Sequence, residues 1–242
     1  MDTLSGQDVL HIWETGQRQH PIDRALTILT VAFPAISRNE FPTLSIGQRD
    51  RLLLAVREAT FGTELAAFAR CPLCQEQLEF TFTTADMRAP VDEEHSHQEY
   101  QLSNAGYELT FRLPNSLDLA ETCHNPALAR QLLIERCVLR VSHNGIERAS
   151  PDLSEEVITV LAAQMAEHDP QAERQIDLKC PGCEHCWSVF FDIGSFIWIE
   201  LYAYARRLLR EVHTLAQAYG WREADILTLS AARRALYLEM VI

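Results

Sequence analysis

The sequence predicts an α+β fold that is mainly helical and contains a zinc-ribbon-like β-hairpin module split by a long insert. Apolar residues recur at intervals of three and four over much of the chain, as on the buried face of a helix. Residues 78–82 and 187–191 instead have the pattern of half-buried strands. Each of these segments follows a Cys-Pro-x-Cys sequence, which indicates a hairpin that ends in a metal-binding turn.

The composition is that of an ordinary globular protein, with 47% hydrophobic and 23% charged residues among 242. The formal net charge is −13, and a field of this sign repels phosphate backbones, so general nucleic-acid binding is not expected. The most apolar region, residues 189–205, is interrupted by Asp192 and Glu200, so we expect no membrane insertion. The N-terminus lacks the pattern of a secretory signal, which favours reduced cysteines.

Residues 1–62 are predicted to form an N-terminal helical region. Helical spacing indicates helices around Val9, over residues 22–32 and over residues 46–59. Gly62 suits the end of the third helix, because glycine tolerates the left-handed backbone that closes a helix.

Residues 63–84 and 173–192 are predicted to form the two halves of the ribbon-like module. In the first half, Leu78, Phe80 and Phe82 alternate with polar residues, so one face of a strand is apolar. The second half repeats the order of strand, Cys-Pro-x-Cys and strand.

The insert between the two halves, residues 85–172, is predicted to be α/β. Alternating residues around a turn indicate a hairpin over residues 100–111, and helical spacing indicates helices over residues 127–138 and, after an Asn-Gly turn, 153–166. The acidic segment 92–97 contains histidines, and we interpret it as a solvated loop rather than a metal site.

Residues 193–242 are predicted to form a C-terminal long helix and a helical tail. Apolar residues spaced by threes and fours cover residues 196–219, and shorter patterns indicate helices over residues 223–227 and 231–241. Ser230 is the expected N-cap of the last helix.

The two Cys-Pro-x-Cys turns together favour a zinc site. Zinc prefers four soft ligands in a tetrahedron, and two cysteines separated by two residues can approach one ion. One such turn alone equally fits a redox dithiol, but two matched turns favour a shared site. We therefore predict one structural zinc ion bound by Cys71, Cys74, Cys180 and Cys183. Such a site has no open coordination position, so the metal would stabilise the fold rather than catalyse.

The identity of the fourth ligand has alternatives. The two turns are separated by 105 residues, whereas roughly 15 to 20 is usual, so the ribbon must hold an insert. Either Cys186 or His185 could replace Cys183, and the thiols could also carry no metal. We prefer Cys183 because its turn matches the turn at Cys71 in three of four positions.

The remaining chemistry is sparse. Cys123 and Cys137 have no companion at short spacing and are expected to be buried hydrophobic residues. The sequence contains no phosphate-binding glycine loop, no His-Glu-x-x-His, no Gly-x-Ser-x-Gly and no dinucleotide fingerprint. We therefore expect no enzyme and no small-molecule substrate.

The C-terminal third has the residues of a protein-binding surface. It carries about +1 over the last 50 residues against about −14 over the first 192, so the charge is segregated. Arginines offset by acids are more typical of a solvated helix face than of a DNA reader. Arg, Tyr and Trp dominate protein interfaces, so we expect the long helix and tail to dock onto a partner or another copy through Arg206, Arg210, Trp221, Arg233 and Tyr237.

Several segments of the chain resemble baseplate proteins of contractile-tailed phages and related contractile injection systems. In the C-terminal third, the resemblance is carried by residues 206–213, 218–227 and 233–239. Further upstream, it is carried by residues 57–62, by Cys71-Pro72-Leu73-Cys74 and by Cys180-Pro181-Gly182-Cys183. Family members commonly place glycine, which tolerates a left-handed backbone, after each cysteine pair, where this chain has Gln75 and Glu184.

The resemblance implies a T-even-type baseplate or baseplate hub assembly protein. It implies an assembly chaperone or minor structural component without catalytic residues, with baseplate or hub subunits as partners. It also implies a place in the cytoplasm of the bacterial cell during particle assembly, whether or not the protein is retained in the assembled particle.

From the residues alone, two other functions stay open. A zinc-ribbon nucleic-acid adaptor needs an exposed basic patch. The residues near the cysteines are instead mainly acidic: Glu76, Glu79, Asp177, Glu184 and Asp192. A dithiol oxidoreductase needs a partly exposed thiol of low pKa beside basic residues, and Arg70 and Lys179 each precede a cysteine pair.

Overall fold

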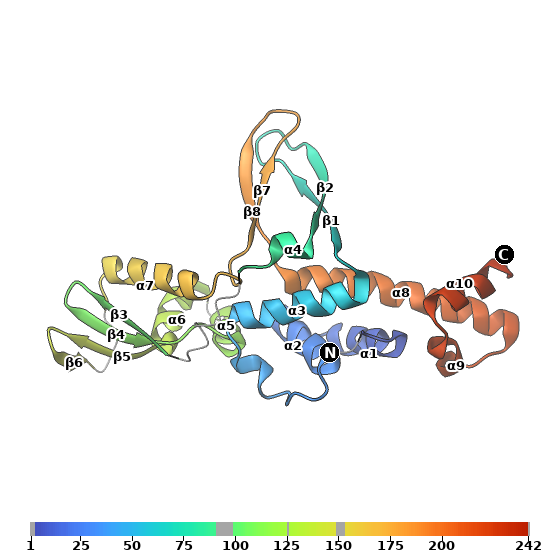
Figure 1. Ribbon diagram of the computed structural model, residues 1–242, viewed down its shortest axis with the longest axis horizontal. Helices are drawn as coiled ribbons and strands as arrows, with labels where there is room; N and C mark the ends of the chain where they lie inside the picture. Colours follow the sequence, from blue (N-terminus) through green and yellow to red (C-terminus); the bar gives the residue numbers. More distant parts are fainter. Residues whose placement is uncertain (1–2, 91–98, 125, 149–152, 242) are drawn as a thin grey trace. The chain divides into compact units, whose positions relative to one another are not determined.

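The computed structural model describes residues 3–90, 99–124, 126–148 and 153–241. It confirms a mixed α+β fold in which helices predominate and the strands form small antiparallel sheets (Figure 1). The chain divides into two units, the first made of residues 1–37, 55–62 and 193–242, the second of residues 38–54 and 63–192. The loop predicted at residues 92–97 lies outside the described residues.

The described residues of the first unit form helices and their connections. These are α1 (Gly6–Gly16), α2 (Pro21–Ala32), the end of α3 (Ile46–Phe61), α8 (Ile193–Tyr219), α9 (Glu223–Thr228) and α10 (Ala231–Glu239). Local sequence sets where the first two begin. Ser5 and Asp8 form a capping box at the start of α1, and Pro21 supplies the first turn of α2. The helices that the spacing predicted in this region are all present.

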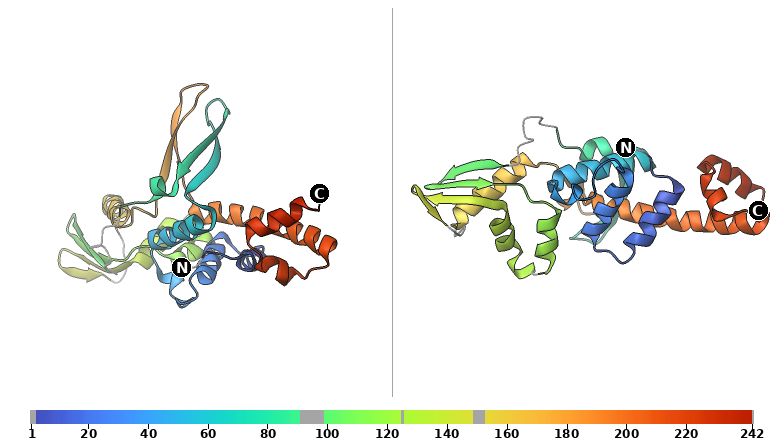
Figure 2. Two further views of the ribbon diagram at one scale, coloured as in Figure 1. Left: turned by 45° about the vertical axis from the view of Figure 1, so that its right-hand side comes forward. Right: turned by 90° about the horizontal axis from the view of Figure 1, so that it is seen from below.

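The first unit is built around α8. Helices α1 and α2 contact it, and α9 and α10 fold back on its C-terminal half (Figure 2). The predicted apolar stripe is confirmed, since its buried members are Ile197, Leu201, Ala205, Leu208, Val212 and Leu215. Only Tyr219, at the end of the stripe, is exposed. Within the described ranges, no helix combines the length and apolar character that a bilayer-spanning segment needs.

A buried ion pair joins the end of α3 to α8. Arg57 is 2% exposed, and its guanidinium donates to the two carboxylate oxygens of Glu200 at 2.9 and 2.8 Å. It also donates to the Gly62 carbonyl at 2.7 Å. Gly62 has a φ of 91°, which confirms its predicted role in ending α3.

The tail is packed against α8. Ile226 and Leu227 of α9 are buried, and Arg234 of α10 is 4% exposed. The Arg234 guanidinium donates to the Glu211 carboxylate of α8 at 2.9 Å and to the Leu229 carbonyl at 2.6 Å. The serine predicted as the N-cap of the last helix does cap α10. The tail therefore belongs to the folded body of the first unit.

The second unit contains the two predicted hairpins (Figure 1). The first pairs β1 (Glu64–Arg70) with β2 (Gln77–Thr83), and the second pairs β7 (Gln175–Lys179) with β8 (Cys186–Phe190). Leu65 lies opposite Phe82 across the first hairpin, and the Phe82 ring meets the Phe191 ring edge-on at 5.4 Å. The two hairpins therefore share an apolar contact at the end away from the cysteine turns.

The rest of the second unit is centred on a four-stranded antiparallel sheet. Its strand order is β3 (Tyr100–Asn104), β4 (Tyr107–Phe111), β5 (Val138–His143) and β6 (Ile146–Arg148). Helix α7 (Glu155–His168) packs on one face, and the shared core consists of Tyr100, Leu102, Leu109, Phe111, Val138, Val141, Val157 and Leu161. The hairpin predicted over residues 100–111 and the helix predicted over residues 153–166 are confirmed.

Other elements of this unit differ from the sequence prediction. Helix α6 (Ala129–Cys137) is preceded by α5 (Ser116–His124), which the sequence analysis missed, together with the short helix α4 (Thr84–Met87). The Asn-Gly turn, expected only as a link between helices, joins β5 to β6. Asn144 and Gly145 both have positive φ there, at 52° and 77°, as a tight hairpin turn requires.

Candidate metal centre

Each hairpin ends in a cysteine turn of the same geometry. In the first turn, the Gln75 N–H donates to the Cys71 carbonyl at 2.9 Å, and the Cys71 N–H donates to the Glu76 carbonyl at 2.8 Å. The same two hydrogen bonds recur around Cys180, at 3.0 and 2.9 Å. The repeated sequence pattern therefore produces two turns with matched backbone hydrogen bonds.

The residue after each cysteine pair adopts the left-handed backbone. Gln75 has a φ of 65° and Glu184 a φ of 58°. These are the two positions at which related proteins were expected to carry glycine. A side chain in this conformation costs on the order of 1 kcal/mol, because Cβ approaches the following carbonyl oxygen. The turns keep their shape despite this cost, so the absence of glycine does not prevent the cysteines from meeting.

The four predicted cysteines converge at the tips of the hairpins. The sulfur atoms of Cys71 and Cys183 lie 3.7 Å apart, and those of Cys74 and Cys180 lie 3.4 Å apart. All four sulfur atoms lie within 4.8 Å of one another. A zinc ion with Zn–S bonds of about 2.3 Å holds its tetrahedral sulfur atoms about 3.8 Å apart. The spacing therefore fits a four-thiolate metal site, and it is far longer than the roughly 2.05 Å of a disulfide.

Burial differs among the four thiols. Cys71 and Cys180 are 0% exposed, Cys183 is half-buried and Cys74 is exposed. Burial raises the pKa of the Cys71 thiol, but hydrogen bonds from the Cys74 and Leu73 backbone outweigh this and lower the pKa to about 7. The exposed Cys74 has a pKa raised to about 12, since hydrogen bonds with Cys180 and Cys183 outweigh a backbone hydrogen bond at Glu76 that lowers it. The thiol of low pKa is thus inaccessible, which does not favour a dithiol oxidoreductase.

Neither alternative fourth ligand joins the cluster. The Cys186 sulfur is directed at the Glu184 carbonyl, 3.7 Å away. The His185 ring stacks beside the Trp187 ring, with 6.0 Å between the centroids. The fourth cysteine of the cluster is therefore Cys183, not Cys186.

The two isolated cysteines have different fates. Cys137 is 0% exposed, so its prediction as a buried residue is confirmed. The prediction for Cys123 is wrong, because this residue is exposed. Helix α5 buries Asp118 and Thr122, and the residue after Thr122 is turned about 100° around the helix, toward solvent.

The surroundings of the cysteines are acidic, as the sequence indicated. Glu76, Glu79, Asp177 and Glu184 are all exposed near the turns, and Lys179 lies 3.8 Å from the Glu184 carboxylate. A negative surface of this kind attracts cations and repels phosphate. It does not favour a nucleic-acid adaptor.

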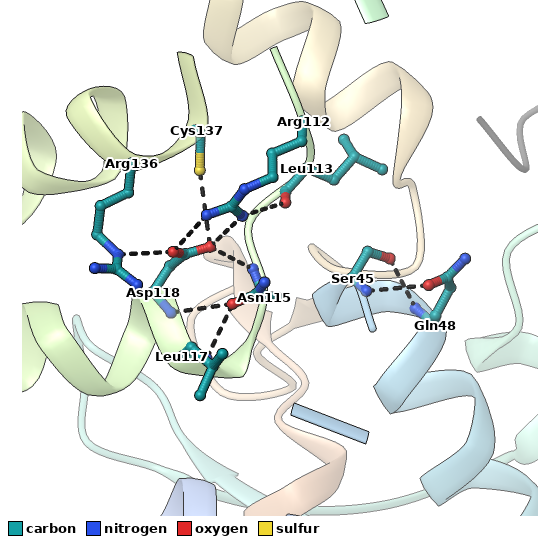
Figure 3. Close-up of polar contacts among 9 residues, drawn as sticks. All are labelled: Ser45, Gln48, Arg112, Leu113, Asn115, Leu117, Asp118, Arg136 and Cys137. Atoms are coloured by element: carbon teal, nitrogen blue, oxygen red, sulfur yellow. Dashed lines mark hydrogen bonds and ion pairs between the residues drawn. The ribbon is translucent and has the colours of Figure 1, made fainter. Parts of the chain in front are cut away.

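A second polar cluster, centred on Asp118 of α5, was not found by sequence analysis (Figure 3). The Asp118 side chain is 0% exposed, and the Arg112 guanidinium donates to its two oxygens at 2.6 and 2.9 Å. Arg136 of α6 donates at 2.8 Å and the Asn115 N–H at 3.0 Å. Burial raises the pKa of Asp118, but these hydrogen bonds, chiefly from Arg112, bring it below its usual range.

The Asp118 cluster connects elements of the second unit. Its carboxylate accepts from the Arg112 guanidinium, from Arg136, from the Asn115 N–H and, at 3.9 Å, from the Cys137 thiol, which ties the end of β4 to α5 and α6 (Figure 3). A sequence signal for it existed, because Asn115 stands three residues before Asp118. The Asn115 side chain accepts from the N–H groups of Leu117 and Asp118, as a helix N-cap does.

Fold and site together define a class: a mainly helical α+β protein whose split hairpin module can hold a metal ion. Residues 14–198 match the family model described as T4 bacteriophage base plate protein. This match covers more than half of the chain, and the chain belongs to that family. The resemblance to baseplate proteins is thereby confirmed, and it implies baseplate proteins as partners. Comparison with curated proteins and with solved structures finds no match.

Proposed function

We propose that this baseplate protein is a non-enzymatic assembly chaperone or minor structural component of a contractile tail or injection system, stabilised by a structural zinc ion. The observation that carries the proposal is the convergence of four sulfur atoms on hairpins that lie within the family match. It acts with baseplate or hub subunits in the bacterial cytoplasm while the particle is assembled.

The proposed zinc ligands are Cys71, Cys74, Cys180 and Cys183. When bound, zinc supplies four metal–thiolate bonds and leaves no position for water or substrate, which supports a structural role. An isolated two-stranded hairpin is marginally stable in water, and each of these hairpins has only two strands. The metal would join their tips, so that residues 63–84 and 173–192 act as one module and residues 85–172 as its insert.

The zinc content of the purified protein tests the ligand set. Full-length protein prepared without chelator is expected to contain about one zinc ion per chain, because two matched turns supply one closed four-thiolate site. Metal content is measured by elemental analysis. The Cys183→Ser variant should lose the zinc, whereas the matched Cys186→Ser variant should keep it. The reverse pattern would show that Cys186 is the fourth ligand, and absence of metal from the wild-type protein would remove the zinc from the proposal.

The role in assembly is tested in cells that produce the particle. Cells lacking this protein are expected to yield no complete baseplates, and the plasmid-borne wild-type protein should restore them. The readout is particle yield by electron microscopy, with recovery of baseplate subunits on the tagged protein as a second measurement. Normal particles in its absence would contradict the proposed function.

A further inference from the structure

One face of α8 points to solvent along several turns and is unusually apolar for an exposed helix surface. Ile199 is 66% exposed, Tyr202 is 40% exposed and Leu209 is 36% exposed. We define the α8 solvent face by the exposed residues on this side of the helix: Ile199, Tyr202, Ala203, Arg206, Leu209, Arg210 and His213. It lies opposite the buried stripe described above. One of its members, Tyr202, also meets the Trp13 ring of α1 edge-on, with 6.3 Å between the centroids, so Ile199 and Leu209 are its most available apolar residues.

The charge of this face differs from that of the rest of the chain. The whole protein has a formal net charge of −13, yet the α8 solvent face contains no carboxylate. The two acids of α8 are engaged at its flanks. Glu200 accepts from Arg57, and Glu211 accepts from Arg234. The α8 solvent face is therefore cationic, because both acids of α8 lie outside it and pair with arginines of other helices.

The two arginines of the face are available for a partner. The Arg206 guanidinium lies 6.0 Å from the centre of the Tyr202 ring. Among the described residues, no carboxylate forms an ion pair with it. No hydrogen bond, ion pair or ring contact of the Arg210 guanidinium is found in the part of the chain that the structure describes. The neighbouring Arg207 differs, because it pairs with Glu211 at 3.5 Å. Two cations thus border an apolar stripe with no acid of the same chain to neutralise them.

The other residues that the sequence suggested as interface anchors are engaged within the tail. The Trp221 ring stacks on Tyr219 at 4.6 Å and meets Tyr237 edge-on at 4.9 Å. The Arg233 guanidinium donates to the Tyr237 hydroxyl at 3.4 Å. Of the five suggested residues, Arg206 and Arg210 therefore remain as the ones that face solvent from α8.

We propose that the α8 solvent face binds an acidic amphipathic helix of a baseplate subunit. This inference rests on the proposed function and names the chemistry of the partner. A partner helix would lay its apolar stripe against Ile199, Tyr202 and Leu209, and its carboxylates would pair with Arg206 and Arg210. The surface spans residues 199–213, or about 21 Å of helix, which suits about four turns of a partner. Tyr and Arg are also the residue types that anchor interfaces most often.

Charge complementarity favours an acidic helix over a second copy of the chain as the partner of this face. A two-fold contact through this face would place Arg206 and Arg210 of both copies in one interface, where the face supplies no carboxylate. Such an arrangement of like charges opposes association. Nucleic acid fits less well, because two arginines beside an exposed isoleucine provide few phosphate contacts.

The binding test uses the zinc-loaded full-length protein and a designed peptide. The peptide is a fluorescent helix of three heptads with Leu at the a and d positions and Glu at e and g, and its control carries Lys in place of Glu. Fluorescence anisotropy is expected to show saturable binding of the Glu peptide and binding at least about tenfold weaker of the Lys peptide. Raising NaCl from 50 to 500 mM should weaken the Glu peptide's binding, since salt screens exposed charges.

Matched charge reversals locate the binding surface. The variant R206E/R210E should bind the Glu peptide at least about tenfold more weakly, and I199A should bind it several-fold more weakly. The control R140E/R148E makes the same change in net charge at exposed residues of β5 and β6, and its affinity should stay within about twofold of wild type. Circular dichroism of each variant verifies that it is folded.

Several outcomes would overturn the inference. These are no binding of the Glu peptide, equal binding by wild type and R206E/R210E, preferential binding of a DNA oligonucleotide to this face, or a dimer that R206E/R210E abolishes. The proposed function is judged separately. If the peptide does not bind but cells without the protein make no baseplates, the docking inference is contradicted and the proposed function is still supported. If those cells make normal particles, the proposed function is contradicted whether or not the peptide binds.

Discussion

The Cys180→Ser variant is expected to lose its zinc and to unfold its hairpin module. Cys180 is 0% exposed and is one of the four cysteines of the cluster, so serine leaves three thiolates and a hard oxygen in a site of closed geometry. The free energy of binding structural zinc is about 10 kcal/mol or more in small zinc domains, and it is coupled to folding. Losing most of it should far exceed the effect of an ordinary surface substitution.

The measurement combines metal content, thermal unfolding by circular dichroism and the soluble yield of the protein. The matched control is Cys186→Ser, which removes an exposed cysteine of the same hairpin that lies outside the cluster. We expect the control to keep about one zinc ion and a Tm close to that of the wild type. A Cys180→Ser protein that retains both its metal and its Tm would contradict the proposed site.

The Asp118→Asn variant is expected to lose about 2–3 kcal/mol of stability, because Asp118 is buried while its partners Arg112 and Arg136 are 26% and 37% exposed. The amide keeps the shape of the carboxylate, but it removes the buried negative charge that Arg112 and Arg136 share. Breaking a buried ion pair at one partner leaves the other charges uncompensated, and this cost is larger than the net value of the pair. The ends of β4, α5 and α6 would lose their common anchor.

Urea unfolding followed by circular dichroism measures this effect. The control is Glu155→Gln, which breaks the pair with Arg130, whose side chains are 77% and 60% exposed. An exposed pair contributes about 0–1 kcal/mol, so the control should differ little from wild type. Equal losses in the two variants would show that the Asp118 cluster contributes no more than a surface pair.

The pH dependence of the Asp118→Asn effect has a defined sign. The pKa of Asp118 is lowered in the folded protein, so its carboxylate stabilises the fold at pH values above the unfolded pKa of about 3.9. This contribution is lost as the pH falls from there through the folded pKa. The difference in stability between wild type and Asp118→Asn should therefore be full at pH 7 and shrink in acid.

Much of the secondary structure and of the candidate site could be predicted because the signals are local. The period of the apolar residues in α8 lies within one helix, and the alternation in β2 lies within one strand. The failures have a common cause. Helix α5 was missed because its buried residues are Ser116, Asp118 and Thr122, so it has no buried apolar stripe to reveal it. The prediction for Cys123 failed for a related reason, because without an apolar stripe the sequence does not show which side of α5 is buried.

The sequence by itself determined the two cysteine turns, the long helix and the baseplate resemblance, because each depends on residues close together in the chain. The tertiary structure decided the rest. It brought Cys71 to Cys183 across the insert, buried Asp118 between two arginines, and turned the acids of α8 inward while Arg206 and Arg210 stayed in solvent. Burial and pairing depend on contacts between residues distant in sequence, and a local pattern does not show which distant residues will be in contact.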